Sequence, residues 1–149
     1  MPRAHRALPR PPSGVTLVEL TIVLVLLGIL VALAIPRAGG ALDRARVTAA
    51  RTEIVALFAV ARHLAIRQGR RTTVSIDVHG GAASVHMGAD TVHRRNLGRS
   101  FGVSLDATQD SMSYHPTGIG YGAANLSIRI SRGRAADTVV VSRLGRVRH

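Results

Sequence analysis

A predominantly apolar run from Val15 to Ile35 constrains this chain more than any other feature. As a helix rising 1.5 Å per residue, the run would extend about 31 Å, which matches the hydrocarbon core of a bilayer. Its one charged residue is Glu19, near its start. Insertion scales put an acid at the centre of a membrane helix at a cost of about 2.5–3.5 kcal/mol. The sequence therefore predicts a hydrophobic helix whose single carboxylate needs a specific role.

A cationic, proline-rich arm precedes the apolar run. Residues 1–13 contain three arginines, several prolines and no acid. Proline disrupts helix interiors, so we expect no helix in the arm. The tendency of positive charge to stay inside predicts that the arm remains on the cytoplasmic side.

Three interpretations of this N-terminal segment compete. It is a secretory signal peptide cut at the small residues Ala32-Leu33-Ala34, an uncut signal anchor, or a short leader cut after Gly14 that leaves the apolar helix in the mature protein. Glu19 favours the third. Cleavage after Gly14 creates an amine at Val15, and a carboxylate about one helical turn away can pair with an amine, whereas a signal peptide or anchor has no use for an acid there.

Composition limits the function of the remaining chain. With 149 residues there is room for one domain beside the apolar segment, and the absence of cysteine excludes disulfides and thiol chemistry. The net charge is +12, and all twenty basic residues are arginine. Arginine suits bidentate contact with phosphate or carboxylate, although a GC-rich genome yields the same bias. The scarcity of aromatic residues argues against a base-stacking platform.

A second helical pattern follows the apolar run. Pro36 predicts a bend, and Gly39-Gly40 predicts a break in the helix. Apolar residues then recur at alternating spacings of three and four, and Gly69 is expected to end the helix. We expect this stripe to pack on a sheet; its members are Val47, Ala50, Ile54, Leu57, Ala61 and Leu64.

After Gly69 the apolar period changes from 3.6 to 2, which is typical of strands. A hairpin is predicted around a two-residue turn at Gly80-Gly81. Its expected facing pairs are Val78 with Ala83, Ile76 with Val85, and Val74 with Met87. Further strands are expected near residues 90–96, 103–105, 111–114, 126–130 and 138–148, with a turn at 131–136. The glycines of residues 115–125 read as turn glycines of a loop.

Catalytic and metal-binding patterns are weak. His79 and His86 lie on the outer face of the predicted hairpin, opposite Ala82 and Ser75, and are expected to be solvated surface histidines. The sequence has no nucleophile elbow, paired carboxylates or P-loop. We therefore predict no enzyme activity, no catalytic residue, no cofactor and no metal site.

The N-terminal segment resembles a known family signal. The stretch SGVTLVELTIVLVLLGILVALAIP, residues 13–36, is similar to the class III signal of type IV prepilins and type II secretion pseudopilins. The resemblance implies that a prepilin peptidase and methyltransferase cuts between Gly14 and Val15 and methylates Val15. Glu19 matches the acid at the family's fifth mature position and Pro36 its helix-kinking proline, both with roles in assembly. Val15 departs from the usual phenylalanine or methionine.

This resemblance gives Glu19 a physical role. In a bundle of apolar helices, a carboxylate that meets the N-terminal ammonium of an adjacent subunit is strongly attracted to it at low dielectric. The pair also sets the axial register between subunits. The simpler alternative is an acid at headgroup level without a partner.

A second resemblance covers parts of the remaining chain. The stretches ARHLAIRQGRRTTVSI, SYHPTGIGYG and TVVVSRLGRVR are similar to the GspH/FimT group of minor pilins. It implies an α+β fold in which the long N-terminal helix, transmembrane and then amphipathic, packs on an antiparallel sheet. The implied organisation is a leader (1–14), a transmembrane helix (15–36), an amphipathic periplasmic helix (37–69) and a β-rich domain (70–149). Its implied surroundings are the bacterial inner membrane and other pilins or pseudopilins in a filament.

The two branches of that group imply different functions. A GspH-like subunit assembles into the pseudopilus of a type II secretion system. In the FimT branch a C-terminal G-R-x-R motif is associated with DNA binding during natural transformation, and Gly145, Arg146 and Arg148 match it, with Arg143 nearby and Arg132 and Arg134 in a turn. The alternative is that these residues simply complete the last strand.

Overall fold

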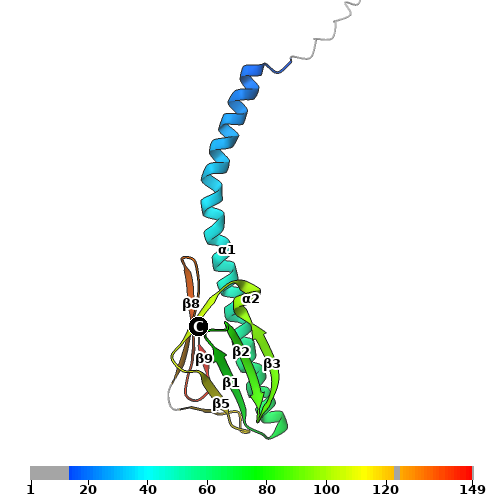
Figure 1. Ribbon diagram of the computed structural model, residues 1–149, viewed down its shortest axis with the longest axis vertical. Coiled ribbons are helices and arrows are strands. Elements are labelled where there is room, and N and C mark those ends of the chain that lie inside the picture. Colours follow the sequence, from blue (N-terminus) through cyan, green and yellow to red (C-terminus); the bar gives the residue numbers. More distant parts are fainter. Residues whose placement is uncertain (1–13, 123–124, 149) are drawn as a thin grey trace, which may run out of the picture. The chain divides into compact units, whose positions relative to one another are not determined.

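The computed structural model describes residues 14–122 and 125–148, apart from the side chains of residues 34–38. Its contacts divide the chain into two compact units, Met1–Arg37 and Ala38–His149. The predicted leader lies, up to residue 13, outside the described residues. The elements (Figure 1) are α1 (Leu17–Gln68), β1 (Thr72–Asp77), β2 (Ala82–Met87), β3 (Asp90–Asn96), α2 (Leu97–Phe101), β4 (Ser104–Ala107), β5 (Ser111–Tyr114), β6 (Gly120–Tyr121), β7 (Leu126–Arg132), β8 (Ala135–Val141) and β9 (Val147–Arg148).

The start of α1 is capped by Thr16. Its Oγ1 accepts a hydrogen bond from the backbone N–H of Glu19 at 3.2 Å. Thr16 and Glu19 have the T-x-x-E spacing of a capping box, and a carboxylate in the first turn also interacts favourably with the helix dipole. Glu19 therefore has a local role in starting the helix, which the sequence interpretation had not assigned.

The first unit exposes an apolar helical surface on all sides. Every large apolar side chain between Val15 and Leu33 is 49–81% exposed. Isolated soluble domains rarely expose so much contiguous apolar surface, so this segment requires a covering partner or lipid. Among the described residues, none of the helices combines the length and hydropathy that the crossing of a membrane requires.

The expected break at Gly39-Gly40 is wrong, because α1 continues through both glycines. A glycine inside a helix costs only about 1 kcal/mol relative to alanine and keeps its backbone hydrogen bonds, which is too little to end a helix that is extended on both sides. The side chain of Pro36 lies outside the described residues. The predicted helix end is confirmed: α1 stops at Gln68, and Gly69 follows with φ of +60°.

The second unit is built on the C-terminal half of α1, which Figure 1 shows against the sheet containing β1, β2 and β3. The unit contains two antiparallel sheets, ordered β3-β2-β1-β5-β6 and β4-β7-β8-β9. The predicted stripe is buried except for Leu64, which is half-buried, and it joins one core with residues from both sheets. The predicted α+β fold, a long helix packed on antiparallel sheet, is confirmed.

The β1–β2 hairpin has a different register from the predicted one. Ile76 pairs with Ala83 and Val74 with Val85, so the connecting turn contains four residues rather than two. The turn is longer because the Asp77 carboxylate accepts a hydrogen bond from Gly80 N–H at 2.8 Å. The shift of two residues keeps every apolar side chain on the core face, since side chains alternate with a period of two.

The two hairpin histidines are also placed differently. His79 lies in the turn, and His86 pairs with Thr73. His86 is half-buried and hydrogen-bonded: its Nε2 lies 2.9 Å from the hydroxyl oxygens of both Ser75 and Ser84. The prediction of a solvated surface histidine is therefore wrong for His86, which belongs to a polar ladder on the outer face of the sheet.

The predicted final strand, residues 138–148, is in fact two strands. β8 ends at Val141, and β9 begins at Val147 after a turn. The helix α2 was not predicted either; Asn96 caps it by accepting a hydrogen bond from Arg99 N–H at 2.8 Å. The predicted loop at residues 115–125 contains the short strand β6, which pairs with β5.

Candidate functional site: the β9 turn and groove

The turn between β8 and β9, residues 142–146 (the β9 turn), is closed by three hydrogen bonds between its own residues. The N–H of Gly145 donates to the Ser142 carbonyl at 2.7 Å, and the N–H of Ser142 donates to the Arg146 carbonyl at 2.8 Å. The N–H of Arg146 donates to Ser142 Oγ at 3.1 Å. The turn fixes the backbone of Arg143 and Arg146, and β9 carries Arg148; all three of these arginines, which the sequence singled out, are exposed.

Gly145 is required by the packing of the β9 turn. Its φ of +82° lies in the left-handed region that favours glycine. A Cβ at this position would lie 2.5 Å from Tyr114 Cε1 and 3.1 Å from the backbone nitrogen of Gly120. The glycine of the G-R-x-R motif therefore has a structural reason to be present, whatever the arginines contact.

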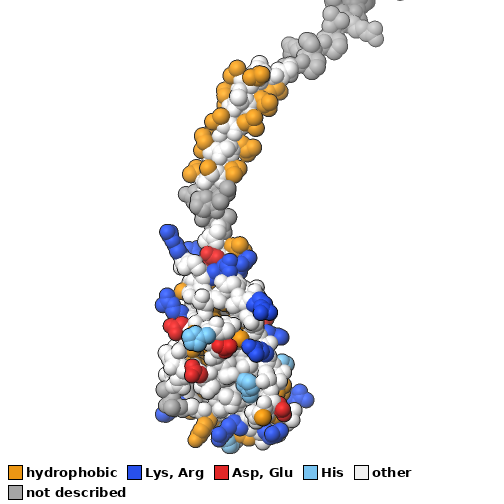
Figure 2. Space-filling model, in the orientation of Figure 1, with side chains coloured by type: hydrophobic (Ala, Val, Ile, Leu, Met, Phe, Trp, Pro, Cys, Tyr) orange, Lys and Arg blue, Asp and Glu red, His pale blue; other side chains and the backbone are white. Residues whose placement is uncertain are grey.

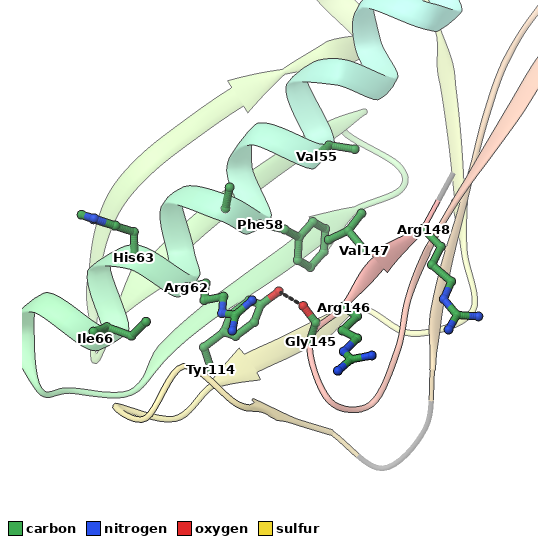
Figure 3. A pocket seen from close by; sticks show the side chains of 11 residues that line it. Val55, Phe58, Arg62, His63, Ile66, Tyr114, Gly145, Arg146, Val147 and Arg148 are labelled. Carbon is green, nitrogen blue, oxygen red and sulfur yellow. Dashed lines mark hydrogen bonds between the residues drawn. The ribbon is translucent and has the colours of Figure 1, made fainter.

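Tyr114 anchors the turn from beneath. Its side chain is almost fully buried, and its hydroxyl donates a hydrogen bond to the Gly145 carbonyl at 3.2 Å (Figure 3). Burial raises the pKa of Tyr114 from 10.0 to about 12, and the positive charge of Arg62 opposes part of that rise. The neutral phenol is the form that the folded protein holds.

This raised pKa predicts a loss of stability at high pH. In the unfolded chain Tyr114 ionises near pH 10, whereas in the folded protein it ionises near pH 12. The contribution of the neutral, buried Tyr114 to the free energy of unfolding is therefore fully present below pH 10. It is lost between about pH 10 and 12, at up to about 1.4 kcal/mol per pH unit. Urea unfolding across this range should show the loss for the unmodified chain and for Tyr121→Phe, but a much smaller one for Tyr114→Phe. Equal pH dependence in all three would contradict the assignment.

A groove of about 700 Å³ lies between α1 and β9 (the β9 groove; Figure 3). Its apolar lining comes from Val55, Phe58, Ala59, Ile66 and Val147, and its polar lining from Arg62, His63, Tyr114, Gly145, Arg146 and Arg148. Figure 3 shows Val147 directed toward Phe58, while Arg146 and Arg148 extend away from α1. The prediction that these two arginines share one face is consistent with this view.

The rim of the groove, formed by Arg62, Arg146 and Arg148, carries positive charge, and no acidic residue lines the groove. Within residues 14–122 and 125–148, the ion pairs are Arg51–Asp137, Arg95–Glu53 and Arg132–Asp43, so none involves a groove arginine. The groove therefore suits an anionic ligand or partner. Figure 2 shows basic side chains distributed over the visible face of the second unit, with several acidic ones interspersed.

Arg132 was grouped with the C-terminal arginines in the sequence, but the structure assigns it elsewhere. It ends β7, and its Nε lies 2.8 Å from Asp43 Oδ1 on α1. Its guanidinium also donates to the carbonyls of Phe101 and Gly102. Arg132 thus links the helix to the second sheet, whereas Arg134 is exposed and Arg143 is not part of the groove lining.

The remaining predicted site residues belong to the first unit. Gly14 and Val15 are exposed, with Val15 at 73%, and Glu19 lies in the first turn of α1. The groove residues that sequence reasoning missed are Arg62 and Tyr114. Arg62 lies off the apolar stripe of α1, and no local sequence pattern connects it with the distant β9. Outside the groove, the sequence interpretation also missed Thr16 at the start of α1, which the T-x-x-E spacing to Glu19 indicates.

Two protein-family models match this sequence. The model of the prokaryotic N-terminal methylation motif matches residues 10–35, and the model of type II transport protein GspH matches residues 50–145. A comparison with curated proteins found no match.

Solved structures show the same fold. The type IV minor pilin FimU of Pseudomonas aeruginosa aligns with a TM-score of 0.59 at 15% identity, covering 70% of this chain and 88% of its own. The minor pseudopilin EpsH of the type 2 secretion system of Vibrio cholerae aligns at 0.56 and 14%, covering 69% and 94%. Pilins and pseudopilins are non-enzymatic filament components. Since the GspH model covers more than half of the sequence, the chain belongs to the family of type II transport protein GspH.

Proposed function

We propose that this chain is a GspH-like minor pseudopilin of the periplasmic pseudopilus of a type II protein secretion system. The observation that carries the proposal is the succession of a methylation motif, an exposed apolar helix and a GspH domain in one chain. A prepilin peptidase would cut between Gly14 and Val15 and methylate the new amine. The subunit acts by assembly with other pseudopilins and not by catalysis.

The exposed apolar segment explains the two environments of such a subunit. Before assembly, the side chains from Val15 to Leu33 are covered by the lipid of the inner membrane, with the second unit in the periplasm. In the filament, neighbouring apolar helices cover the same side chains, so extraction does not expose them to water. Glu19 pairs with the ammonium of an adjacent subunit and sets the axial register. Pro36 bends the helix so that it can pack against neighbouring helices in the filament.

Mass spectrometry of the mature N-terminus tests this proposal. We expect methylated Val15 as the first residue in cells with the prepilin peptidase, and the complete precursor in cells without it. Gly14→Asp should block cleavage, whereas Val15→Phe, which restores the residue usual in related signals, should be processed normally. A mature chain that begins at Ile35 would show a conventional signal peptide and overturn the proposal.

A FimT-like DNA receptor of a type IV pilus is the second candidate function. The exposed arginines Arg62, Arg146 and Arg148 around the groove, none of them in an ion pair within the described ranges, favour it. Contacts with phosphate would be salt-dependent and independent of sequence.

Gel retardation of duplex DNA tests this second candidate. We expect Arg146→Ala with Arg148→Ala to abolish retardation at physiological salt. The matched control, Arg94→Ala with Arg99→Ala, removes the same charge from other exposed positions and should retain it. Absence of retardation even at low salt would exclude DNA as a ligand of this surface.

A further inference from the structure

We propose that the β9 groove captures an extended, acidic segment of a partner protein, which adds as a strand to the free edge of β9. This strand is the last of its sheet, with β8 on one side and no strand of the described residues on the other. An unpaired sheet edge is a template for another strand, and many peptides are recognised in this way.

The register of β9 leaves backbone groups available at this edge. Ser142 N–H donates to the Arg146 carbonyl, and the pairs Val141↔Val147 and Val140↔Arg148 follow. Hydrogen-bonded and non-hydrogen-bonded pairs alternate in an antiparallel ladder, so Val147 occupies a non-hydrogen-bonded position. Its N–H and C=O therefore point away from β8. The consecutive residues from Gly145 to Arg148 all line the groove. The carbonyl of Leu144, just before them, already accepts a hydrogen bond from Gly120 N–H at 3.1 Å, so the free backbone groups are those of Val147.

The apolar floor of the groove suits alternate side chains of an added strand. Val147 and Phe58 face each other, and Val55 continues the apolar surface along α1 (Figure 3). Successive side chains of a strand point to opposite sides, so every second residue of the added segment would contact this floor. A segment with small apolar residues at alternate positions fits this geometry.

The charge of the rim selects the occupant. Arg62 lies on α1 beside the floor, whereas Arg146 and Arg148 extend from the face of β9 opposite to Val147, and the lining contains no acid. Acidic residues at the other positions of the added strand would lie on the same face as Arg146 and Arg148 and would meet their guanidinium groups. A second copy of this chain, with a net charge of +12, is a poor occupant because like charges repel. The phosphates of duplex DNA could contact the rim arginines, but DNA would contact neither the apolar floor nor the backbone groups of the strand edge. The geometry therefore favours a peptide.

Fluorescence anisotropy of the full chain in detergent micelles tests this inference. The probe is a fluorescein-labelled ten-residue peptide that alternates aspartate and valine. We expect saturable binding that is weakened at least tenfold by Ala59→Trp, because Ala59 is exposed in the groove lining. Ala56→Trp is the matched control: Ala56 is exposed on the same helix outside the lining, and its replacement should change the Kd less than twofold. Circular dichroism verifies that both variants are folded.

Two further probes separate strand addition from simple charge attraction. The same peptide with N-methylated backbone at alternate residues keeps its charge but loses the N–H donors of one edge, and should bind at least tenfold more weakly. A peptide that alternates arginine and valine should not bind. Equal binding of the methylated peptide, or no binding of the original, would overturn the proposal; duplex DNA binding without peptide binding would assign the groove to nucleic acid. None of these failures affects the pseudopilin proposal, which the mature N-terminus tests separately.

Discussion

A Glu19→Gln variant should be processed normally but enter filaments at less than one tenth of the unmodified level. In the proposed filament, glutamine would remove the charge that neutralises the N-terminal ammonium of the adjacent subunit, and one uncompensated buried charge costs about 3–5 kcal/mol. The helix cap survives this change, because it uses the backbone N–H of Glu19 and the hydroxyl of Thr16. The measurement is the ratio of the subunit in sheared filaments to the subunit in membranes, by immunoblot.

Two variants distinguish the charge pair from local effects on α1. Thr16→Ala removes the cap and should reduce filament incorporation only slightly, since an N-cap contributes about 1 kcal/mol. Gly28→Ala adds a methyl group where no atom of the same chain lies within 4 Å, so it should leave α1, its cap and the charge of Glu19 intact and reports packing against neighbouring helices alone. Normal incorporation of Glu19→Gln would show that the carboxylate needs no partner.

A Gly145→Ala variant should lose about 2–4 kcal/mol of unfolding free energy. Part of this loss is the strain of a left-handed φ in alanine, and part is the collision of Cβ with the Tyr114 ring and the Gly120 backbone. Neither neighbour yields easily: one is a buried ring and the other is a backbone. Urea or thermal unfolding measures the change.

Gly69→Ala is the matched control for this collision. Gly69 also has a positive φ, of +60°, but a Cβ added there would have no atom within 4 Å. Alanine there should cost about 1 kcal/mol, from backbone strain alone. If both variants lose the same stability, the tight contact among Tyr114, Gly120 and Gly145 does not contribute. Gly145→Ala is accordingly a poor probe of DNA binding, because it alters the turn that orients Arg146.

Much of the fold follows from spacing along the chain. The stripe from Val47 to Ala61 predicts a helix and the face it buries, and Gly69 predicts where that helix ends. The strands at residues 90–96 and 111–114 were predicted with the bounds that the structure shows. The register of β1 with β2 could not be predicted in this way, because a shift of two residues buries the same side chains. The hydrogen bond of the Asp77 carboxylate in the turn decides between the two registers.

The sequence by itself determined the features that depend on neighbours in the chain: the apolar helix with its acid at Glu19, the amphipathic helix, the alternating strands and the G-R-x-R pattern. Only the tertiary structure decided that Arg132 pairs with Asp43, that Tyr114 and Gly120 impose a glycine at position 145, and that Arg62 and Arg148 border one groove. The reason is physical. Periodicity and local propensity act over a few residues, whereas these contacts join residues far apart in the sequence, and only the packing of α1 against both sheets brings them together.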